Sequence, residues 1–390
     1  MTAWIGRSRT GMAIAAIALA GIGLIEAPDL IAATTPISAL TRKVVLEKDA
    51  DKYAWKLIAA PVPVVGDHQV LVHVRAVAIN RGDLDLLNSV NPQHDLTGRQ
   101  VASDAAGDVV AVGKLVTQVR VGARVTSTHF RNWTDGAPTR EQMMFAHGFA
   151  VDGVLADYVA LDDTAVIAMP PRLSYEEAAT LPTAGLTGWM ASVGMQPLRP
   201  TDVVLIQGTG GVSIFALQFA AAAGAHLILT SSSDGKLARA QRIAKHDSIN
   251  YHIVPAWSVR VRELSGGHGA NLVIDVGGTS TLPESLKSLA IGGRLSLVGD
   301  LTGYDGQISA YSAISKLARI QGVYVGSRAD FQRMNAFILA RRLHPVIDRV
   351  FPLEQFQAAL DYVTAGDFIG KVVLSLDPGT SLTEPTRTGT

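Results

Sequence analysis

One segment of the chain reads Asp202-Val-Val-Leu-Ile-Gln-Gly-Thr-Gly-Gly-Val-Ser-Ile-Phe-Ala-Leu-Gln-Phe-Ala220. A short apolar run typical of a buried strand comes first, and an amphipathic helical pattern follows the glycines. Gly208 permits a tight turn, and Gly210 lets a pyrophosphate group approach the helix N-terminus, where backbone N–H groups are unpaired. Ser213 replaces the third glycine of the usual spacing and is still small enough for close packing. The segment therefore predicts a dinucleotide-binding turn at Gly208, Gly210, Gly211 and Val212.

Strands and helices alternate around this segment. Short apolar runs recur at residues 203–206, 227–230, 272–275 and 294–298, with helical stretches between them. Such runs are typical of buried parallel strands, so the chain from Pro170 onward predicts a doubly wound sheet. Its first helix starts at the capping-box pair Ser174 and Glu177. The strand after the turn also disfavours the alternative interpretation, in which the glycine cluster is a turn without a ligand.

The first third of the chain is rich in strands instead. Strand-like patterns occupy residues 42–47, 69–79, 106–113, 122–125 and 153–161, and they predict an antiparallel, barrel-like β domain. Residues 132–147 contain Gly136 and Pro138 and are expected to form a loop. Near the end of the chain, an amphipathic helix is predicted at residues 354–363 and a strand at residues 371–376.

The residues after the second parallel strand indicate which dinucleotide binds. An acidic side chain there would bind the ribose 2′-hydroxyl of NAD. This chain instead has the hydroxyls of Ser231, Ser232 and Ser233 followed by Lys236, and these groups suit a 2′-phosphate. Asp234 argues against that choice because its carboxylate would repel the phosphate, and the serines as a solvated loop are the alternative. The sequence favours NADPH over NADH.

The amino-acid composition disfavours some classes of function. The chain has 390 residues, 48% hydrophobic and 17% charged, which predicts two domains. Lys+Arg 34 balance Asp+Glu 34, so the net positive charge that drives nucleic-acid binding is missing and a small-molecule substrate is expected. The absence of cysteine excludes disulfides and thiolate zinc sites.

The N-terminus resembles a targeting signal. Arg7 and Arg9 precede an apolar run at residues 12–25, which is shorter than the roughly 20 residues that a spanning helix needs. The possible cleavage sites are poor because Ile25, Leu30 or Ile31 would occupy the position that prefers a small residue. An exported or membrane-anchored protein, with contact through residues 11–25, and a wrongly assigned start remain alternatives. A cytoplasmic location is favoured because the predicted cofactor is a cytosolic one.

Several ordered motifs resemble one family. They are Ala78-Ile-Asn-Arg-Gly-Asp-Leu84, Ser103-Asp-Ala-Ala-Gly107, Asp152-Gly-Val-Leu-Ala-Asp-Tyr158, Ala178-Ala-Thr-Leu-Pro-Thr-Ala-Gly-Leu-Thr187, Gln207-Gly-Thr-Gly-Gly-Val212, Ile249-Asn-Tyr251 and Gly370-Lys-Val-Val373. The chain resembles zinc-free members of the medium-chain dehydrogenase/reductase superfamily, in the quinone oxidoreductase-like and zinc-type alcohol dehydrogenase-like branch. The likeness extends from about Lys43 to Leu376.

This resemblance implies an α/β fold with a GroES-like β-rich catalytic domain and a Rossmann doubly wound parallel-sheet domain. The implied ranges are a leader at 1–41, the catalytic domain at 42–171, the NADP-binding domain at 172–327, a return to the catalytic domain at 328–376 and a disordered tail at 377–390. An active site in the cleft and a homodimer are also implied. For the cofactor, the resemblance implies Thr187 beside the nicotinamide and Lys236 and Tyr251 at the 2′-phosphate, and it adds Gly277, Val298 and Lys371 to the binding residues.

Zinc is not expected at this cleft. Zinc-bearing relatives use a cysteine and a His-Glu pair, and at the matching positions this chain has Asn80 and Ser103-Asp104. An amide and a hydroxyl are poor donors for zinc. His129 and His147 are isolated, without a ligand-spacing pattern, so a metal role is not expected for them either.

Without a metal, hydrogen-bond donors must stabilise the oxygen on which negative charge accumulates. Asn80 is the first candidate for this catalytic role. Asp83 and Asp104 are candidates for positioning water or anchoring the site, with plain backbone capping as the alternative. Relatives often have a tyrosine directly after the asparagine, whereas this chain has Arg81, so the proton donor stays unassigned.

These observations together predict a zinc-independent, NADPH-dependent oxidoreductase that transfers hydride to a quinone, an enone or another activated carbonyl compound. The alternatives are a zinc-free NAD(P)-dependent alcohol dehydrogenase and a non-catalytic NADPH-binding sensor or scaffold. Other classes are disfavoured because the chain lacks a Gly-x-Ser-x-Gly elbow, a His-Glu-x-x-His pair and a Gly-Lys-Ser/Thr phosphate loop.

Overall fold

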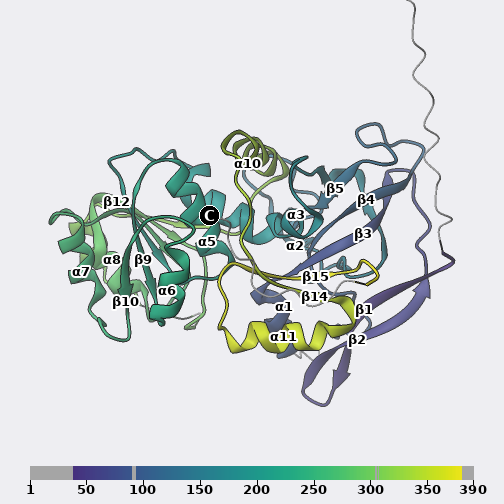
Figure 1. Ribbon diagram of the computed structural model, residues 1–390, viewed down its shortest axis with the longest axis horizontal. Helices are drawn as coiled ribbons and strands as arrows, with labels where there is room; N and C mark the ends of the chain where they lie inside the picture. Colours follow the sequence, from purple (N-terminus) through teal and green to yellow (C-terminus); the bar gives the residue numbers. More distant parts are fainter. Residues whose placement is uncertain (1–37, 90–93, 304, 306, 380–390) are drawn as a thin grey trace, which may run out of the picture. The chain divides into compact units, whose positions relative to one another are not determined.

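The computed structural model describes residues 38–89, 94–303, 305 and 307–379 (Figure 1). The chain divides into a unit of residues 1–38 and a unit of residues 39–390, and the second contains the elements described below. The predicted apolar run at 12–25 and the tail from residue 380 on lie outside the described residues. Within the described ranges, no helix is long and apolar enough to cross a bilayer. A cytoplasmic location stays a prediction.

A six-stranded parallel sheet forms the centre of the predicted nucleotide-binding part (Figure 1). Its strands are β8 (Val203–Gln207), β9 (His226–Ser231), β10 (Asp247–Asn250), β11 (Ala270–Asp275), β12 (Leu289–Leu297) and β13 (Arg319–Gly322), in the order β10-β9-β8-β11-β12-β13. Its helices are α5 (Gly211–Ala222), α6 (Asp234–Ala240), α7 (Trp257–Leu264), α8 (Leu282–Ser288) and α9 (Ala310–Ser315). The strand order reverses beside β8, where open parallel sheets bind ligands. The predicted doubly wound parallel sheet is confirmed.

A second, seven-stranded sheet joins the two ends of the described chain. Its path is β14 (Ile347–Pro352), β15 (Lys371–Ser375), β3 (Gln69–Ile79), β4 (Asp104–Val112), β5 (Arg124–Ser127) and β7 (Val166–Ala168), with β6 (Tyr158–Asp162) paired to β3. The pairs are antiparallel except β14 with β15. Pairing of β15 with β3 puts Val372 opposite Ile79, so residues from opposite ends of the sequence become neighbours.

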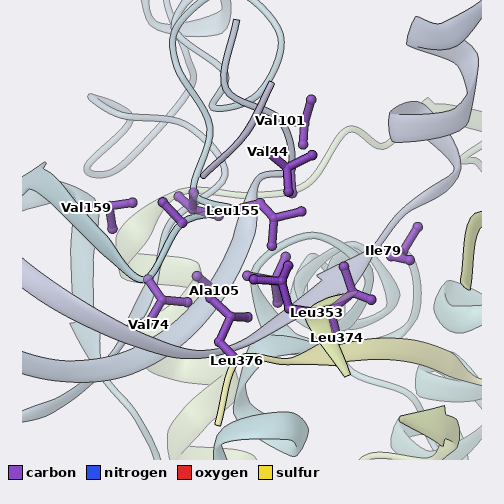
Figure 2. Packing of buried hydrophobic residues seen from close by; sticks show 14 of the residues in the cluster. Val44, Val74, Ile79, Val101, Ala105, Leu155, Val159, Leu353, Leu374 and Leu376 are labelled. Carbon is purple, nitrogen blue, oxygen red and sulfur yellow. The ribbon is translucent and has the colours of Figure 1, made fainter. Parts of the chain in front are cut away.

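A hairpin, β1 (Leu40–Asp49) with β2 (Lys52–Pro61), packs on the same apolar core. Figure 2 shows Val44 from the hairpin, Val74 and Ile79 from β3, and Leu353 and Leu374 from the C-terminal part in one cluster. All five side chains are at most 3% exposed. Burial of apolar surface from both ends of the sequence stabilises this assembly.

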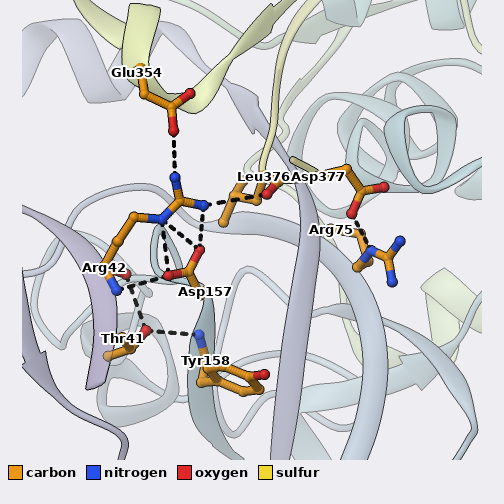
Figure 3. Close-up of polar contacts among 8 residues, drawn as sticks. All are labelled: Thr41, Arg42, Arg75, Asp157, Tyr158, Glu354, Leu376 and Asp377. Carbon is orange, nitrogen blue, oxygen red and sulfur yellow. Dashed lines mark hydrogen bonds and ion pairs between the residues drawn. The ribbon is translucent and has the colours of Figure 1, made fainter. Parts of the chain in front are cut away.

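Polar contacts fasten the C-terminal segment at the edge of this core (Figure 3). The Arg42 guanidinium donates to Asp157 at 2.7 Å and also pairs with Glu354. The same group reaches the carbonyl oxygen of Leu376 at 3.4 Å, and Arg75 pairs with Asp377. Because the partners come from the hairpin, from β3, from the loop before β6 and from the C-terminal segment, these ion pairs link regions that are distant in sequence.

Six helices lie around the second sheet among the described residues. They are α1 (Arg81–Leu87), α2 (Arg140–Met144), α3 (Tyr175–Ala179), α4 (Leu186–Trp189), α10 (Arg328–Arg341) and α11 (Phe356–Ala365). The chain also forms 3-10 turns at Asp163–Ala165 and Leu353–Gln355 and π-helical turns at Leu181–Gly185 and Met190–Gly194. The predicted capping box at Ser174 and Glu177 is present at α3. The prediction of a loop throughout residues 132–147 was wrong for α2, because Thr139 and Gln142 form a capping box that starts a helical turn there.

Candidate active site

A cleft of about 720 Å³ lies at the carboxyl ends of β8 and β9 and reaches the residues that follow β3. Of the predicted site residues, those that line it are Asn80, Gly208, Gly210, Gly211, Val212, Ser231, Ser232, Lys236, Tyr251, Val298 and Lys371. The cleft therefore brings together predicted site residues from segments of both sheets.

The glycine turn leaves a space that fits a pyrophosphate group. Gly208 has a φ of +72°, a conformation that favours glycine, and its N–H donates to Thr230 O at 2.8 Å. Gly210 begins α5 without a side-chain cap, and a Cβ built on it would meet no atom within 4 Å. Ser213 Oγ donates to Gln207 O at 2.6 Å, so the helix packs closely on the strand. The first N–H groups of α5 thus face an open cradle suited to an anion.

The groups predicted to bind the 2′-phosphate border the cleft. Ser231, Ser232, Lys236 and Tyr251 line it, and Lys236 Nζ donates to Gly366 O at 2.9 Å. Asp234, which argued against NADPH, is not among the lining residues, and its carboxylate accepts from Asn250 Nδ2 at 2.9 Å. The part of the cleft lined by Ser231, Ser232 and Lys236 therefore presents two hydroxyl groups and an ammonium group to a ligand.

Asn80 and Lys371 meet because β15 pairs with β3. Lys371 Nζ donates to Asn80 Oδ1 and to Ile79 O, each at 2.6 Å. Burial lowers the pKa of Lys371, and the nearby carboxylates of Asp104 and Asp83 oppose that shift. The amide oxygen of Asn80 is occupied by the ammonium group, and Asn80 Nδ2 donates to Ser103 Oγ at 3.5 Å, so the second hydrogen of Nδ2 is the donor that the amide can offer to a ligand in the cleft.

The two predicted carboxylates lie behind the cleft wall. Asp104 Oδ1 accepts from Ser103 Oγ at 2.6 Å and from Thr183 Oγ1 at 2.5 Å, and its Oδ2 accepts from the Thr183 N–H at 3.0 Å. Asp83 Oδ2 accepts from the Asn80 N–H at 2.7 Å, and burial raises the pKa of Asp83 to about 7. Neither is among the residues that line the cleft: Asp104 holds Ser103 and Thr183, and Asp83 holds the Asn80 N–H.

Three other predicted cofactor residues are also absent from the lining. Thr187 is buried in α4, Ser233 caps α6 by accepting from the Lys236 N–H at 3.3 Å, and the Gly277 N–H donates to Asp275 at 2.9 Å. Arg81, whose role was left open, does line the cleft and pairs with Asp85 at 3.0 Å.

Sequence reasoning missed the residues at the polar end of the cleft. His129, Thr183, Phe149 and Tyr324 line it beside Asn80 and Ser103. His129 is 3% exposed, its Nδ1 lies 2.9 Å from Thr183 Oγ1, and its Nε2 is buried without a hydrogen-bond partner. Burial lowers the pKa of His129 to about 4. Thr183 lies inside one of the motifs quoted above, but no spacing links it to His129.

The donor set of this cleft does not fit zinc. Among the described residues, no group of three or more His, Asp or Glu side chains could hold a metal ion. The oxygen of Asn80 already accepts from an ammonium group, and both oxygens of Asp104 accept hydrogen bonds. A cation at this position would meet the positive charge of Lys371.

Comparisons with known proteins agree with this architecture. Residues 66–171 match the family described as alcohol dehydrogenase GroES-like domain, and residues 211–340 match the family described as zinc-binding dehydrogenase. A zinc-type alcohol dehydrogenase-like protein of Schizosaccharomyces pombe is 39% identical over 320 residues, which cover 79% of this chain and 91% of that one. The quinone oxidoreductase of Sus scrofa is 26% identical over 327 residues, covering 82% and 92%.

Two solved structures share the fold. The crystal structure of a putative alcohol dehydrogenase from Sinorhizobium meliloti 1021 is 37% identical with a TM-score of 0.82, covering 87% of this chain and 100% of that one. The crystal structure of an NAD-dependent alcohol dehydrogenase is 30% identical with a TM-score of 0.78, covering 86% and 100%. With its GroES-like β domain and its Rossmann-type parallel sheet, the chain belongs to the medium-chain dehydrogenase/reductase superfamily of NAD(P)-dependent oxidoreductases.

Proposed function

We propose that this enzyme is a zinc-independent, NADPH-dependent reductase of a quinone, an enone or another activated carbonyl compound. The observation that carries the proposal is the Asn80 amide, which lines the cleft and is oriented by the 2.6 Å hydrogen bond from Lys371. The nicotinamide, when bound, supplies a hydride. The N–H of Asn80 that does not donate to Ser103 would stabilise the negative charge that develops on the acceptor oxygen, because its orientation is set before the reaction.

The cofactor preference is proposed from the cleft beside β9. Ser231 and Ser232 supply hydroxyls, and Lys236 supplies a positive charge that would attract a 2′-phosphate. The carboxylate of Asp234 is bonded to Asn250 and does not line the cleft. One similar solved structure is that of an NAD-dependent alcohol dehydrogenase, so the test includes both coenzymes.

Zinc independence rests on the chemistry of the same residues. The buried ammonium of Lys371 supplies the positive charge next to Asn80, in the place of a metal ion. Elemental analysis of the purified enzyme is expected to find no stoichiometric zinc, and activity is expected to survive treatment with a chelator. Stoichiometric zinc together with loss of activity on chelation would contradict this part of the proposal.

An acceptor screen with both coenzymes tests the function as a whole. Quinones, enones and aromatic aldehydes or ketones are offered with NADPH and with NADH, and alcohols are offered with the oxidised coenzymes. Reduction with NADPH is expected to be fastest, and Asn80→Leu is expected to lower turnover with little change in the dissociation constant of NADPH. Faster alcohol oxidation would favour an alcohol dehydrogenase, and tight NADPH binding without any turnover would favour a sensor or scaffold.

We also propose a homodimer that forms along β13. This strand ends the six-stranded sheet among the described residues, and Ile314, Leu317 and Ile320 near it are exposed. An uncovered strand edge with apolar neighbours is suited to pairing with the same edge of a second copy. Light scattering of the purified protein is expected to give twice the mass of the chain, and Ile320→Lys is expected to shift it toward the monomer. A monomeric wild-type protein would reject the proposal.

A further inference from the structure

We propose that His129 takes up, through Nε2, the proton of the substrate hydroxyl, so that the substrate couple is a carbonyl compound and its alcohol. The inference rests on the proposed function and narrows it, because an enone reduced at its carbon–carbon double bond has no hydroxyl proton for His129 to accept. It also supplies the proton-transfer residue that the motifs left unassigned.

Hydrogen bonds behind the cleft wall fix which nitrogen of His129 carries a hydrogen. Thr183 Oγ1 has one hydrogen and donates it to the Asp104 carboxylate at 2.5 Å. Toward His129 Nδ1, at 2.9 Å, the same oxygen therefore acts as the acceptor, and Nδ1 is the nitrogen that bears the hydrogen. In the neutral ring, Nε2 then has a free lone pair.

The position of Nε2 indicates a ligand. His129 is 3% exposed and lines the cleft, and its Nε2 is buried without a partner. Buried polar atoms are ordinarily hydrogen bonded, so the unpaired acceptor of a residue that lines the cleft is suited to a donor from a ligand. The rings of Phe130 at 4.7 Å, Phe149 at 5.9 Å and Tyr324 at 5.8 Å between centroids surround the imidazole. The donor therefore belongs to a substrate with an apolar or aromatic body.

Asn80 and His129 belong to one connected polar group. Asn80 Nδ2 lies 3.5 Å from Ser103 Oγ, which lies 3.2 Å from Thr183 Oγ1, and that oxygen contacts His129. We expect the substrate hydroxyl to lie between Asn80 and the other ring nitrogen, with its oxygen accepting from Asn80 Nδ2 and its hydrogen donated to His129 Nε2. A carbonyl oxygen accepts from Asn80 Nδ2 and has no hydrogen to donate to His129 Nε2. The pair thus accommodates both members of a carbonyl and alcohol couple.

In the oxidising direction, the O–H bond of the alcohol breaks and its proton bonds to Nε2, while the carbinol carbon loses a hydride to the oxidised nicotinamide dinucleotide and the C–O bond becomes C=O. The resulting imidazolium keeps its Nδ1–H on Thr183, which Asp104 holds in place, and releases the other proton to water. Reduction is the reverse: Nε2 first takes up a proton from water and then passes it to the oxygen, as the carbonyl carbon receives the hydride. Because burial lowers the pKa of His129 to about 4, the ring is neutral and able to accept near pH 7.

Matched variants test the role of each group. His129→Asn keeps an N–H that can donate to Thr183 but removes the Nε2 acceptor, and general acid–base catalysis is worth about 10²- to 10⁴-fold, so a loss of at least about 10²-fold in kcat/KM is expected. Thr183→Val, which removes the hydroxyl, is expected to lose activity, and Thr183→Ser to retain it. His147→Asn is the control, because His147 is equally buried, also has an unpaired Nε2 and does not line the cleft.

The probes are 1-phenylethanol with oxidised coenzyme, acetophenone with NADPH, and 2-cyclohexenone with NADPH. Losses confined to the first two probes in His129→Asn support the inference. A wild-type enzyme that reduces only the carbon–carbon double bond of 2-cyclohexenone, or a His129→Asn enzyme with unchanged kcat/KM for 1-phenylethanol, overturns it and leaves the proposed function standing. An enzyme that binds NADPH and turns over no probe overturns both.

Nitrogen NMR of histidine-labelled wild-type enzyme gives a second readout that does not depend on turnover. The Nδ1–H form of His129 is expected in the free protein, and the Nε2 resonance is expected to move when 1-phenylethanol is added with oxidised coenzyme but not when its methyl ether is added. An Nε2–H form, or an Nε2 resonance that ignores the alcohol, contradicts the inference. This measurement decides the matter even where His129→Asn does not fold.

Discussion

Asn80 and Lys371 lie 291 positions apart, yet Lys371 Nζ donates a 2.6 Å hydrogen bond to Asn80 Oδ1. The antiparallel pairing of β15 with β3 brings them together, and the bond is charge-assisted. It prevents the amide from turning its oxygen to the cleft. Gly211 makes room for the lysine, since a Cβ at that position would lie 2.6 Å from Lys371 Cδ. The orientation of the Asn80 amide in the cleft therefore depends on the pairing of β15 with β3 and on the space that Gly211 leaves for Lys371.

Lys371→Met is therefore expected to lower kcat, because the amide loses the group that orients it. Removing one oxyanion donor costs about 10²- to 10³-fold, and a misoriented donor is expected to cost about tenfold or more. The decisive measurement is a double-mutant cycle with Asn80→Leu. If lysine acts on turnover through the amide, Lys371→Met costs little more in the Asn80→Leu background, and full additivity of the two losses would show separate roles. Any contact of Lys371 with the cofactor is measured separately as the dissociation constant of NADPH.

Gly210→Ala tests the cradle for the pyrophosphate group. Its φ of −72° suits alanine, and the added Cβ meets no atom within 4 Å, so the free protein is expected to keep its melting temperature. The methyl group would occupy the space into which a pyrophosphate must fit, so the dissociation constant of NADPH is expected to rise about tenfold or more, equivalent to roughly 1.4 kcal/mol. Calorimetric titration of the free enzyme measures it.

Gly322→Ala is the matched control for that substitution, because a Cβ there also meets nothing and Gly322 does not line the cleft. If Gly210→Ala binds NADPH as tightly as the wild type does, the pyrophosphate group does not bind at this turn.

The central strands of both sheets could be predicted from the sequence because they are short apolar or alternating runs. The strands β2, β7, β10, β13 and β14 were not predicted, and β10 and β13 lack such a pattern. The glycine turn was equally clear, since Gly208 and Gly210 stand between a strand and a helix that the structure contains. The helix α2 was missed because Gly136 and Pro138 dominate the local pattern, although Thr139 and Gln142 form its capping box. Local signals of this kind are in the sequence but compete with stronger turn signals.

The polar end of the cleft could not be predicted in the same way. His129 follows β5, Thr183 lies in the π-helical turn after α3, and Phe149 belongs to a loop, so no common period or spacing joins them. Their contact depends on how the sheet edge and the helices pack. Asp104 was predicted in the right neighbourhood, but only the structure shows that its carboxylate is directed to Thr183 and Ser103 and does not line the cleft.

Lys236→Ala tests the choice of coenzyme. The side chain lines the cleft next to Ser231 and Ser232, and it now donates to Gly366 O at 2.9 Å, a neutral partner that a 2′-phosphate would outcompete. We expect the ratio of kcat/KM with NADPH to that with NADH to fall about tenfold or more, since a charge-assisted hydrogen bond contributes about 1.5–3 kcal/mol. Lys245→Ala, an exposed lysine outside the cleft lining, is the control. A preserved ratio would assign the 2′-phosphate to other residues.

Asp83 predicts a pH dependence of stability. Burial raises the pKa of Asp83 from 3.8 to about 7, so the folded protein holds this proton more tightly than the unfolded chain does. The stabilisation is fully present below pH 3.8 and is lost as the pH rises through about 7, because the folded state must then hold an ionised buried carboxylate. Asp83→Asn stays neutral and keeps an oxygen that can accept from the Asn80 N–H. It is therefore expected to be more stable than the wild type at high pH.

The measurement is the difference in melting temperature between Asp83→Asn and the wild type at about pH 5.5 and about pH 8.5, where each unit of pKa shift corresponds to about 1.4 kcal/mol. The difference is expected to grow in favour of the variant as the pH rises. Burial also lowers the pKa of His129, which removes stability as the pH falls below 6.5 toward about 4, but both proteins share that effect and it cancels. Asp51→Asn, which changes an exposed carboxylate outside the cleft lining, is the control and is expected to give the same difference at both pH values. A difference that is equal at the two pH values would mean that the Asp83 carboxyl group is ionised throughout this range, and its contact with the Asn80 N–H would then stabilise the charged form.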